Sequence, residues 1–280
     1  ARVPIVRISV AGVAVDLSVE NELPVFKSRL LHEYTLIDAR FQQLVLLVKA
    51  WAKARNIGSA QHGTFNSFGL SLLVLHYLQQ VDPPVLPFLN QDHQGSNRQP
   101  LLAYAPPLLG KRHGDGGNLI EIRHYSHEEL GEWQSDNHSS VTMLVHGFFK
   151  YFARKFPWRT HVVSVTTPDM LLKSSVTVRS AKRAVIIQDP LDDNDNVARN
   201  IDNQSATRIL HEFERAYSLE FGTLLSEVRS AAATAAPPAH AQAQRQRQPT
   251  LQHNIEKANV FRYTQALASC RNPGDVLHII

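Results

Sequence analysis

The chain opens with apolar and polar residues in alternation, which is the pattern of strands with one buried face. Two alternating runs, VPIVRISV and VAVDLSV, flank Ala11–Gly12, a pair that favours a turn, so we predict a β-hairpin over residues 3–19. One face of the second run carries Val13, Val15, Leu17 and Val19. Asp16 falls on the opposite face, so a carboxylate projects from the predicted sheet.

From about Arg29 to Leu89 the apolar residues follow a helical period instead. The segment DARFQQLVLLVKAWAKARN has Asp38 as its predicted N-cap, and its apolar stripe consists of Phe41, Leu44, Val45, Val48 and Trp51. The segment NSFGLSLLVLHYLQQV is apolar nearly all round, which is typical of a core helix, and Pro83–Pro84 end it.

The second half of the chain predicts two more helices and two short strands. The helices are SSVTMLVHGFFKYFARKF, over residues 139–156, and SATRILHEFERAYSLEFGTLLSEV. The strands are HVVSVTT and RAVIIQDP. Residues 91–118 are rich in Gly, Pro, Asn and His and predict a loop. The low-complexity run AAATAAPPAHAQAQRQRQPT predicts a disordered linker.

Composition sets limits without choosing a function. The 280 residues are 43% hydrophobic and 19% charged, which is ordinary for a globular protein with one or two domains. A net charge of +4 permits a polyanionic partner and does not require one. The single cysteine, Cys270, excludes a disulfide framework and a cysteine-rich zinc site. No apolar run approaches the ~18 residues of a membrane helix, so no membrane contact is expected.

Two lysines in the first long helix raise a question of function. Lys49 and Lys53 are four residues apart, so their ammonium groups lie on one helix face, one turn apart. Like charges at this spacing repel by about 0.2–0.5 kcal/mol. Such a pair is usually a solvated stripe, but a triphosphate beside it would give both cations a partner.

The residue types present, in their order along the chain, suit the addition of nucleotides to an RNA 3′ end. That reaction needs carboxylates for two divalent metals, cations on the triphosphate, and an aromatic ring under the base. Asp16 is the candidate catalytic residue and metal ligand. The candidate nucleotide-binding residues are Asn21, Ser28, Lys49, Lys53, Ser67, Phe68, Asp189, Asp192 and Asp195.

The proposed roles follow the chemistry of each side chain. Asn21 would hold the ribose hydroxyl, Ser67 would add a hydroxyl to the phosphates, and Phe68 would stack on the base. The carboxylates in QDPLDDNDNVAR would read the base edge. Each residue taken alone has an ordinary structural explanation: Asp16 as a solvated strand residue, Phe68 as core, Asn21 as a helix cap and Asp189–Pro190 as a turn. Their joint order and spacing favour the nucleotide site.

Six segments resemble, in order, the template-independent poly(A) polymerases and terminal uridylyltransferases of the DNA polymerase β superfamily. They are VPIVRISVAGVAVDLSVEN, LIDARFQQLVLLVKAWAKARNI, HGTFNSFGLSLLVLHYLQ, PPVLPFL, LVHGFFKYFARKFPW and IIQDPLDDNDNVARNI. The resemblance covers roughly residues 2–222 and is to the cytoplasmic uridylyltransferase-type branch. It implies an α+β fold: the end of a nucleotidyltransferase palm sheet (residues 1–28), then a mainly helical central domain with a PAP-associated segment (29–230). A linker (231–250) and a tail of unassigned role (251–280) follow.

The resemblance also assigns roles to residues. Asp16 matches the last of three palm aspartates that hold two Mg²⁺ or Mn²⁺ ions. Lys49 and Lys53 match the pair that contacts the triphosphate of UTP or ATP, and Ser67 and Phe68 match the serine and the stacking aromatic. Residues 189–199 match the late nucleotide-recognition loop.

The chain departs from the family pattern at several positions. The Gly-Ser and Asp-x-Asp segment that carries the first two aspartates is absent, so we expect this chain to be a fragment or a processed product that is inactive alone. Lys27 stands where many relatives carry a base-contacting asparagine, and Pro24 stands for a small residue. Phe68 replaces the usual tyrosine. Asp195 stands where some uridylyltransferases carry a histidine that favours UTP, which leaves the base preference open.

From these observations we predict an RNA 3′-terminal nucleotidyltransferase that acts in RNA turnover in the cytoplasm. It would add UMP, in preference to AMP, to an RNA 3′ end; the oligomeric state is not predicted. One alternative is a non-catalytic module of the same fold that binds RNA or a protein partner. Another is an enzyme that modifies a small nucleotide or oligonucleotide.

Overall fold

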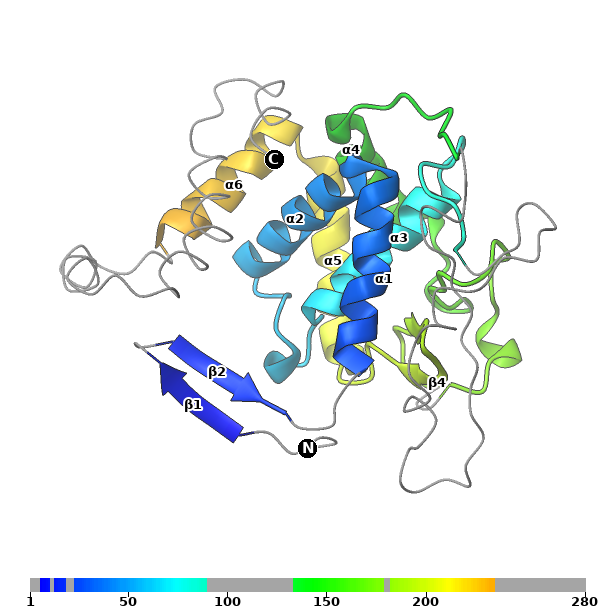
Figure 1. Ribbon diagram of the computed structural model, residues 1–280. Coiled ribbons are helices and arrows are strands. Elements are labelled where there is room, and N and C mark those ends of the chain that lie inside the picture. The colour runs from blue at the N-terminus through cyan, green and yellow to red at the C-terminus, as the bar shows by residue number, and fades with distance from the viewer. Residues whose placement is uncertain (1–5, 11–12, 19–22, 90–132, 179–181, 235–280) are drawn as a thin grey trace.

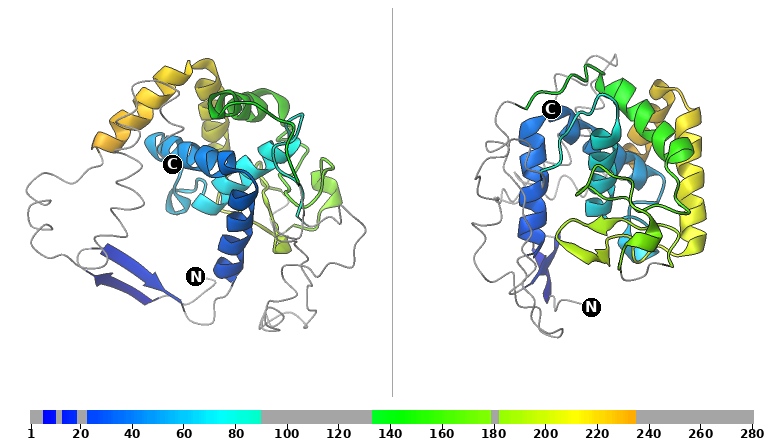
Figure 2. Two further views of the ribbon diagram at one scale, coloured as in Figure 1. Left: turned by 45° about the horizontal axis from the view of Figure 1, so that its top comes forward. Right: turned by 90° about the vertical axis from the view of Figure 1, so that its right-hand side faces the viewer.

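The computed structural model describes residues 6–10, 13–18, 23–89, 133–178 and 182–234, which form a hairpin and a helical body (Figure 1). Strands β1 (Val6–Val10) and β2 (Val13–Leu17) pair antiparallel, so the predicted hairpin is confirmed. Asp16 lies in β2 opposite Arg7. The hairpin lies beyond the N-terminal end of α1 (Leu23–Ile37), to one side of the helices (Figures 1 and 2).

The helix α2 (Ala39–Ala54) forms as predicted. Asp38 is its N-cap and accepts a hydrogen bond from the backbone N–H of Arg40 at 2.9 Å. The Arg40 guanidinium also donates to the carbonyls of Asn137 and Ser139, at 2.6 and 3.0 Å. The start of α2 is therefore tied to the segment that precedes α4 (Val141–Lys150).

The core helix is α3 (Ser67–Gln80), in which every residue from Gly69 to Gln79 is buried. Asn66 caps it by accepting from the backbone N–H of Gly69 at 2.6 Å. Burying an aliphatic side chain stabilises a protein by roughly 1.5–3 kcal/mol, so this helix contributes much of the core. The prediction of a buried helix ending before Pro83 is confirmed.

An aromatic cluster joins α4 to its neighbours. Phe149 meets Trp51 of α2 edge-on, with 4.8 Å between ring centroids, and Phe152 lies 5.5 Å from Phe213 of α5 (Asn203–Ser218). The helix continues from α4 into a π-helical turn at Tyr151–Lys155, so the predicted helix over residues 139–156 is confirmed in place and differs in its last turn.

Several elements differ from the sequence-based prediction. The helix α1 begins at Leu23, six residues before the expected change of period, because Phe26, Leu30 and Tyr34 form a buried stripe at four-residue spacing. It therefore crosses the predicted domain limit at residue 28, and the domain limits stay a prediction. Two short 3₁₀ turns, Ala60–His62 and Lys173–Ser175, complete the helical elements described.

The predicted last helix is in fact two helices. The helix α5 ends at Ser218, where Leu219 adopts an extended backbone, and α6 (Phe221–Thr234) folds back toward α2. Arg215 of α5 holds Glu227 of α6 through two contacts, at 2.8 and 2.5 Å. This contact between the two helices stabilises their arrangement after the break.

The two predicted strands are shorter than expected, and the acidic segment predicted as a loop forms a strand. Of RAVIIQDP, only β3 (Gln188–Asp189) forms a strand, and of HVVSVTT only isolated bridges remain, one of them between Val163 and Ile187. The acidic run β4 (Asp192–Asn196), expected as loop, pairs antiparallel with β3. Buried Asn196 accounts for this, because its side chain accepts from the N–H of Ile187 and donates to the carbonyl of Val185.

Other parts of the prediction lie outside the described residues. They include the loop at residues 91–118, residues 235–250 of the linker, and the tail. Residues 231–234, predicted as the start of the disordered linker, instead form the last turn of α6, because their alanines favour a helix. Within the described part of the chain, no helix has both the length and the apolar character needed to cross a membrane.

Candidate nucleotide-binding site

Three residues from distant parts of the chain meet at the N-terminal end of α1. The Lys27 ammonium of α1 donates to Oδ2 of Asp189 in β3, 162 residues away, and forms an ion pair with it. The same ammonium lies over the ring of Phe68 of α3, 4.9 Å from the ring centroid, as a cation–π contact. Figures 1 and 2 show this end of α1 beside the β3–β4 ribbon. We call these three residues the Lys27 cluster.

Local structure fixes each member of the cluster. Lys27 follows Phe26, whose burial sets the rotation of α1. Phe68 is the second residue of α3, and the Asn66 cap that starts this helix also reaches the carbonyl of Val197 after β4, at 3.4 Å. Asp189 ends β3 and accepts from the backbone N–H of Leu191 through Oδ1, at 3.0 Å.

The ion pair between Lys27 and Asp189 is largely shielded from solvent. The Asp189 side chain is 1% exposed and that of Lys27 is 19% exposed. Burial raises the pKa of the Asp189 carboxyl, while Lys27 and the N–H of Leu191 oppose that rise. Removing either partner would leave a buried charge without compensation, which typically costs about 3–5 kcal/mol.

The other carboxylates of β3–β4 also have local partners. Asp195 is buried and forms an ion pair with Arg199 at 2.8 Å. Asp192 is buried, and its Oδ1 accepts from the backbone N–H of Asn194 at 3.3 Å. Burial and the neighbouring Asp192 raise the pKa of Asp193. The three predicted base-reading carboxylates thus come from one paired ribbon and not from an open loop.

The two lysines of α2 lie in different surroundings. Lys49 is half-buried, and burial lowers the pKa of its ammonium, whereas Lys53 is exposed. Among the described residues, neither ammonium has a hydrogen bond or an ion pair. A half-buried cation without a partner is unfavourable, so Lys49 is suited to an anionic ligand. Its contact with triphosphate stays a prediction.

The remaining candidates are only partly described. Ser67 is exposed at the first turn of α3, and the exposed Ser28 hydroxyl donates to the carbonyl of Pro24 at 2.9 Å. Asn21 lies outside the described residues, as does the side chain of Asp16. From the predicted set, the structure thus brings together Phe68 and Asp189.

Sequence reasoning left Lys27 out of the site. The signal that could have included it is the stripe of Phe26, Leu30 and Tyr34, which extends α1 backward and places Lys27 on a helix. Its contact with Asp189 has no sequence signal, because 162 residues separate the two.

A metal site needs several ligands close together, and the described residues do not provide such a group. In the ranges that the structure describes, no group of three or more His, Cys, Asp or Glu side chains could hold a metal ion. The described residues therefore do not make up a complete two-metal site.

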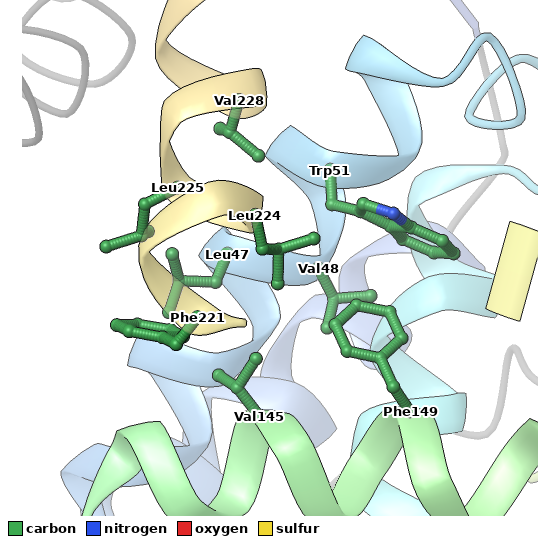
Figure 3. Close-up of a pocket in the computed structure, with 9 residues that line it drawn as sticks. All are labelled: Leu47, Val48, Trp51, Val145, Phe149, Phe221, Leu224, Leu225 and Val228. Carbon is green, nitrogen blue, oxygen red and sulfur yellow. The ribbon is translucent and has the colours of Figure 1, made fainter. Parts of the chain in front are cut away.

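An apolar hollow lies elsewhere, between α2, α4 and α6 (Figure 3). Its volume is about 10 Å³, which is barely enough to admit one water molecule. It is lined by Leu47, Val48, Trp51, Val145, Phe149, Phe221, Leu224, Leu225 and Val228. Its size and lining make it a packing gap under α6 and exclude it as a nucleotide site.

Known proteins are similar to this chain in sequence and in fold. The sequence profile of the Cid1 family poly A polymerase matches residues 140–195. Terminal uridylyltransferase cid1 of Schizosaccharomyces pombe is 31% identical over 257 residues, which is 81% of this chain and 59% of that protein. Poly(A) RNA polymerase GLD2-A of Xenopus laevis is 29% identical over 219 residues, covering 78% of this chain and 40% of that protein.

A solved structure is also similar to this chain. A crystal structure of the Cid1 poly(U) polymerase with Mg 3′-dATP bound superposes with a TM-score of 0.66 at 30% identity, covering 80% of this chain and 68% of that one. The chain thus spans about half the length of the two relatives matched by sequence and two thirds of this structure. It belongs to the family of RNA terminal nucleotidyltransferases that includes the terminal uridylyltransferases and the Cid1-type poly(A) polymerases.

Proposed function

We propose that the protein carrying this chain is an RNA 3′-terminal nucleotidyltransferase, and that residues 23–234 provide most of its nucleotide-binding surface. The reaction transfers UMP, or less readily AMP, from the nucleoside triphosphate to an RNA 3′ hydroxyl and releases pyrophosphate. The setting is RNA turnover in the cytoplasm. Asp16 and carboxylates supplied from outside the described residues would hold Mg²⁺ or Mn²⁺, which activates the hydroxyl and stabilises the phosphoryl transfer.

The observation that carries this proposal is the convergence of Phe68 and Asp189 in the Lys27 cluster. A ring that stacks on a base needs a face that is not packed in the core. Phe68 is only partly buried, and the Lys27 ammonium lies over its ring, so a base would stack on this face in place of the ammonium.

The second observation that supports the proposal is the partial burial of the Lys49 ammonium. Its half-buried ammonium has no partner among the described residues, and Lys53 lies one helical turn away. A triphosphate would neutralise both cations and remove the repulsion between them. Ser67, exposed at the start of α3, adds a hydroxyl and the positive end of a helix dipole.

The test is primer extension by the complete protein, with each of the four nucleoside triphosphates and a labelled RNA. We expect lengthening by single nucleotides, and its loss in Asp16→Ala with circular dichroism unchanged. A complete protein that binds RNA without extending it would instead be the non-catalytic module. Extension only of nucleotides or very short oligonucleotides would identify the small-substrate enzyme. Full extension by Asp16→Ala would refute the metal role of Asp16.

A further inference from the structure

We infer that Met170 is a site of reversible oxidation, and that its sulfoxide weakens the contact between α3 and the π-helical turn. This inference goes beyond the proposed function and does not depend on it. Met170 is 36% exposed, so a peroxide in solvent can reach it. Its Sδ lies 3.8 Å from the hydroxyl oxygen of Tyr151, the first residue of the π-helical turn.

From Tyr151 a chain of polar groups leads into the core. The Tyr151 hydroxyl lies 3.0 Å from Nε2 of His76 in α3, and Nδ1 of His76 lies 2.7 Å from the carbonyl of Ser164. His76 and Ser164 are both buried. Because the Ser164 carbonyl only accepts, Nδ1 donates to it, and Nε2 needs the hydroxyl proton of Tyr151. Met170 therefore lies at the outer end of a hydrogen-bonded chain that begins in the core.

Contacts on either side keep Met170 beside Tyr151. A backbone bridge joins His161 to Leu172, two residues after Met170. Two residues before it, the carbonyl of Pro168 accepts from the side-chain amide of Gln80 at 3.1 Å. The segment that carries the sulfur is thus held against α3, and the sulfur stays near the hydroxyl.

Oxidation changes which acceptor the Tyr151 hydroxyl meets. A peroxide transfers one oxygen to the sulfur: its O–O bond breaks and an S–O bond forms. The sulfur loses two electrons, and the rest of the peroxide leaves as water or an alcohol, which keeps the proton. A thioether sulfur is a weak acceptor, so in the reduced protein the hydroxyl proton stays with His76. A sulfoxide oxygen is polar and competes for that proton, which leaves Nε2 of His76 as a buried acceptor without a donor.

The second methionine of the chain is a matched control. The sequence contains two methionines, and Met143, in α4, is 62% exposed. Among the described residues, its sulfur has no hydrogen bond. Oxidation of Met143 therefore adds a polar oxygen at the surface and should leave the fold unchanged.

The test is urea denaturation of the 280-residue chain before and after treatment with hydrogen peroxide, with mass spectrometry to locate the added oxygen. Every protein carries Cys270→Ser, so that the thiol does not react. We expect oxidation to raise the unfolding equilibrium constant about tenfold, equivalent to ~1.4 kcal/mol, and methionine sulfoxide reductases to reverse the change. Met143→Leu should respond in the same way, whereas Met170→Leu should change by less than about twofold.

Two further variants test the route through Tyr151. Tyr151→Phe removes the hydroxyl, so oxidation of Met170 should change its unfolding equilibrium constant by less than about twofold. Met170→Gln places an amide oxygen near the hydroxyl without peroxide, and it should be less stable than Met170→Leu. An effect of oxidation that persists at full size in Met170→Leu or in Tyr151→Phe overturns the inference. So does a Met170 that peroxide leaves unoxidised, or one that is fully oxidised with no change in stability.

Discussion

Acidification should destabilise the fold through one buried histidine, His76 of α3. Its side chain is 2% exposed, with Nδ1 2.7 Å from the carbonyl of Ser164 and Nε2 3.0 Å from the hydroxyl of Tyr151. Because the carbonyl only accepts, Nδ1 carries the proton and Nε2 accepts from Tyr151. Burial lowers the pKa of His76 from 6.5 to about 4. A second proton, on Nε2, would have to point at a hydroxyl that now donates to it.

The sign and size of the effect follow from proton linkage. The folded-state pKa lies below the unfolded-state value, so the unfolded chain takes up the proton first as the pH falls below 6.5. The contribution of neutral His76 to the free energy of unfolding is therefore complete above about pH 6.5, and it is lost as the pH falls from 6.5 to 4. The full loss is about 3 kcal/mol at ~1.36 kcal/mol per pKa unit, and about 2 kcal/mol of it is reached by pH 5.

The assay is urea denaturation at pH 7 and pH 5, comparing the wild type with His76→Gln. Glutamine keeps a donor and an acceptor but does not titrate. Carboxylates also respond to pH. The pKa of Glu212, for example, is lowered, because its contacts with Arg55 and Arg215 outweigh the effect of burial. These groups are common to both proteins, so their effect cancels in the difference. We expect the wild type to lose about 2 kcal/mol more than the variant over this step. The exposed His62, changed to Gln, is the control and should behave as the wild type. Equal losses in the wild type and His76→Gln would refute the reasoning.

Two further predictions concern packing and substrate binding. Gly147→Ala should lower the free energy of unfolding by about 1–3 kcal/mol, because its Cβ would lie 2.1 Å from the hydroxyl oxygen of Tyr77. Thermal denaturation measures this, and Gly222→Ala, whose Cβ meets nothing within 4 Å, should show little loss; equal losses would contradict the packing argument. In the complete protein, Lys49→Ala should raise the KM for nucleoside triphosphate about tenfold, a loss of ~1.4 kcal/mol, and Lys53→Ala by less because it is exposed. An unchanged KM in steady-state extension by both variants would exclude the triphosphate contact.

The candidate site was only partly accessible to sequence reasoning. Phe68 and Asp189 were identified by residue type and by resemblance, since both lie in recognisable segments. Lys27 was noticed only as a departure from a family pattern. Its role in the cluster depends on α1 passing beside β3, and no periodicity or spacing encodes a contact across 162 residues.

By itself, the sequence determined the elements whose signals are local. The alternating hairpin, the Asp38 cap with its stripe and the apolar α3 were predicted because cap and period are properties of neighbouring residues. Only the tertiary structure decided that DDNDN is a strand and that the last helix breaks at Leu219. Buried Asn196 and partly exposed Arg215 stabilise those conformations through contacts with other segments. The same applies to the ion pair of Lys27: a buried charge needs its partner in space, whatever their separation along the chain.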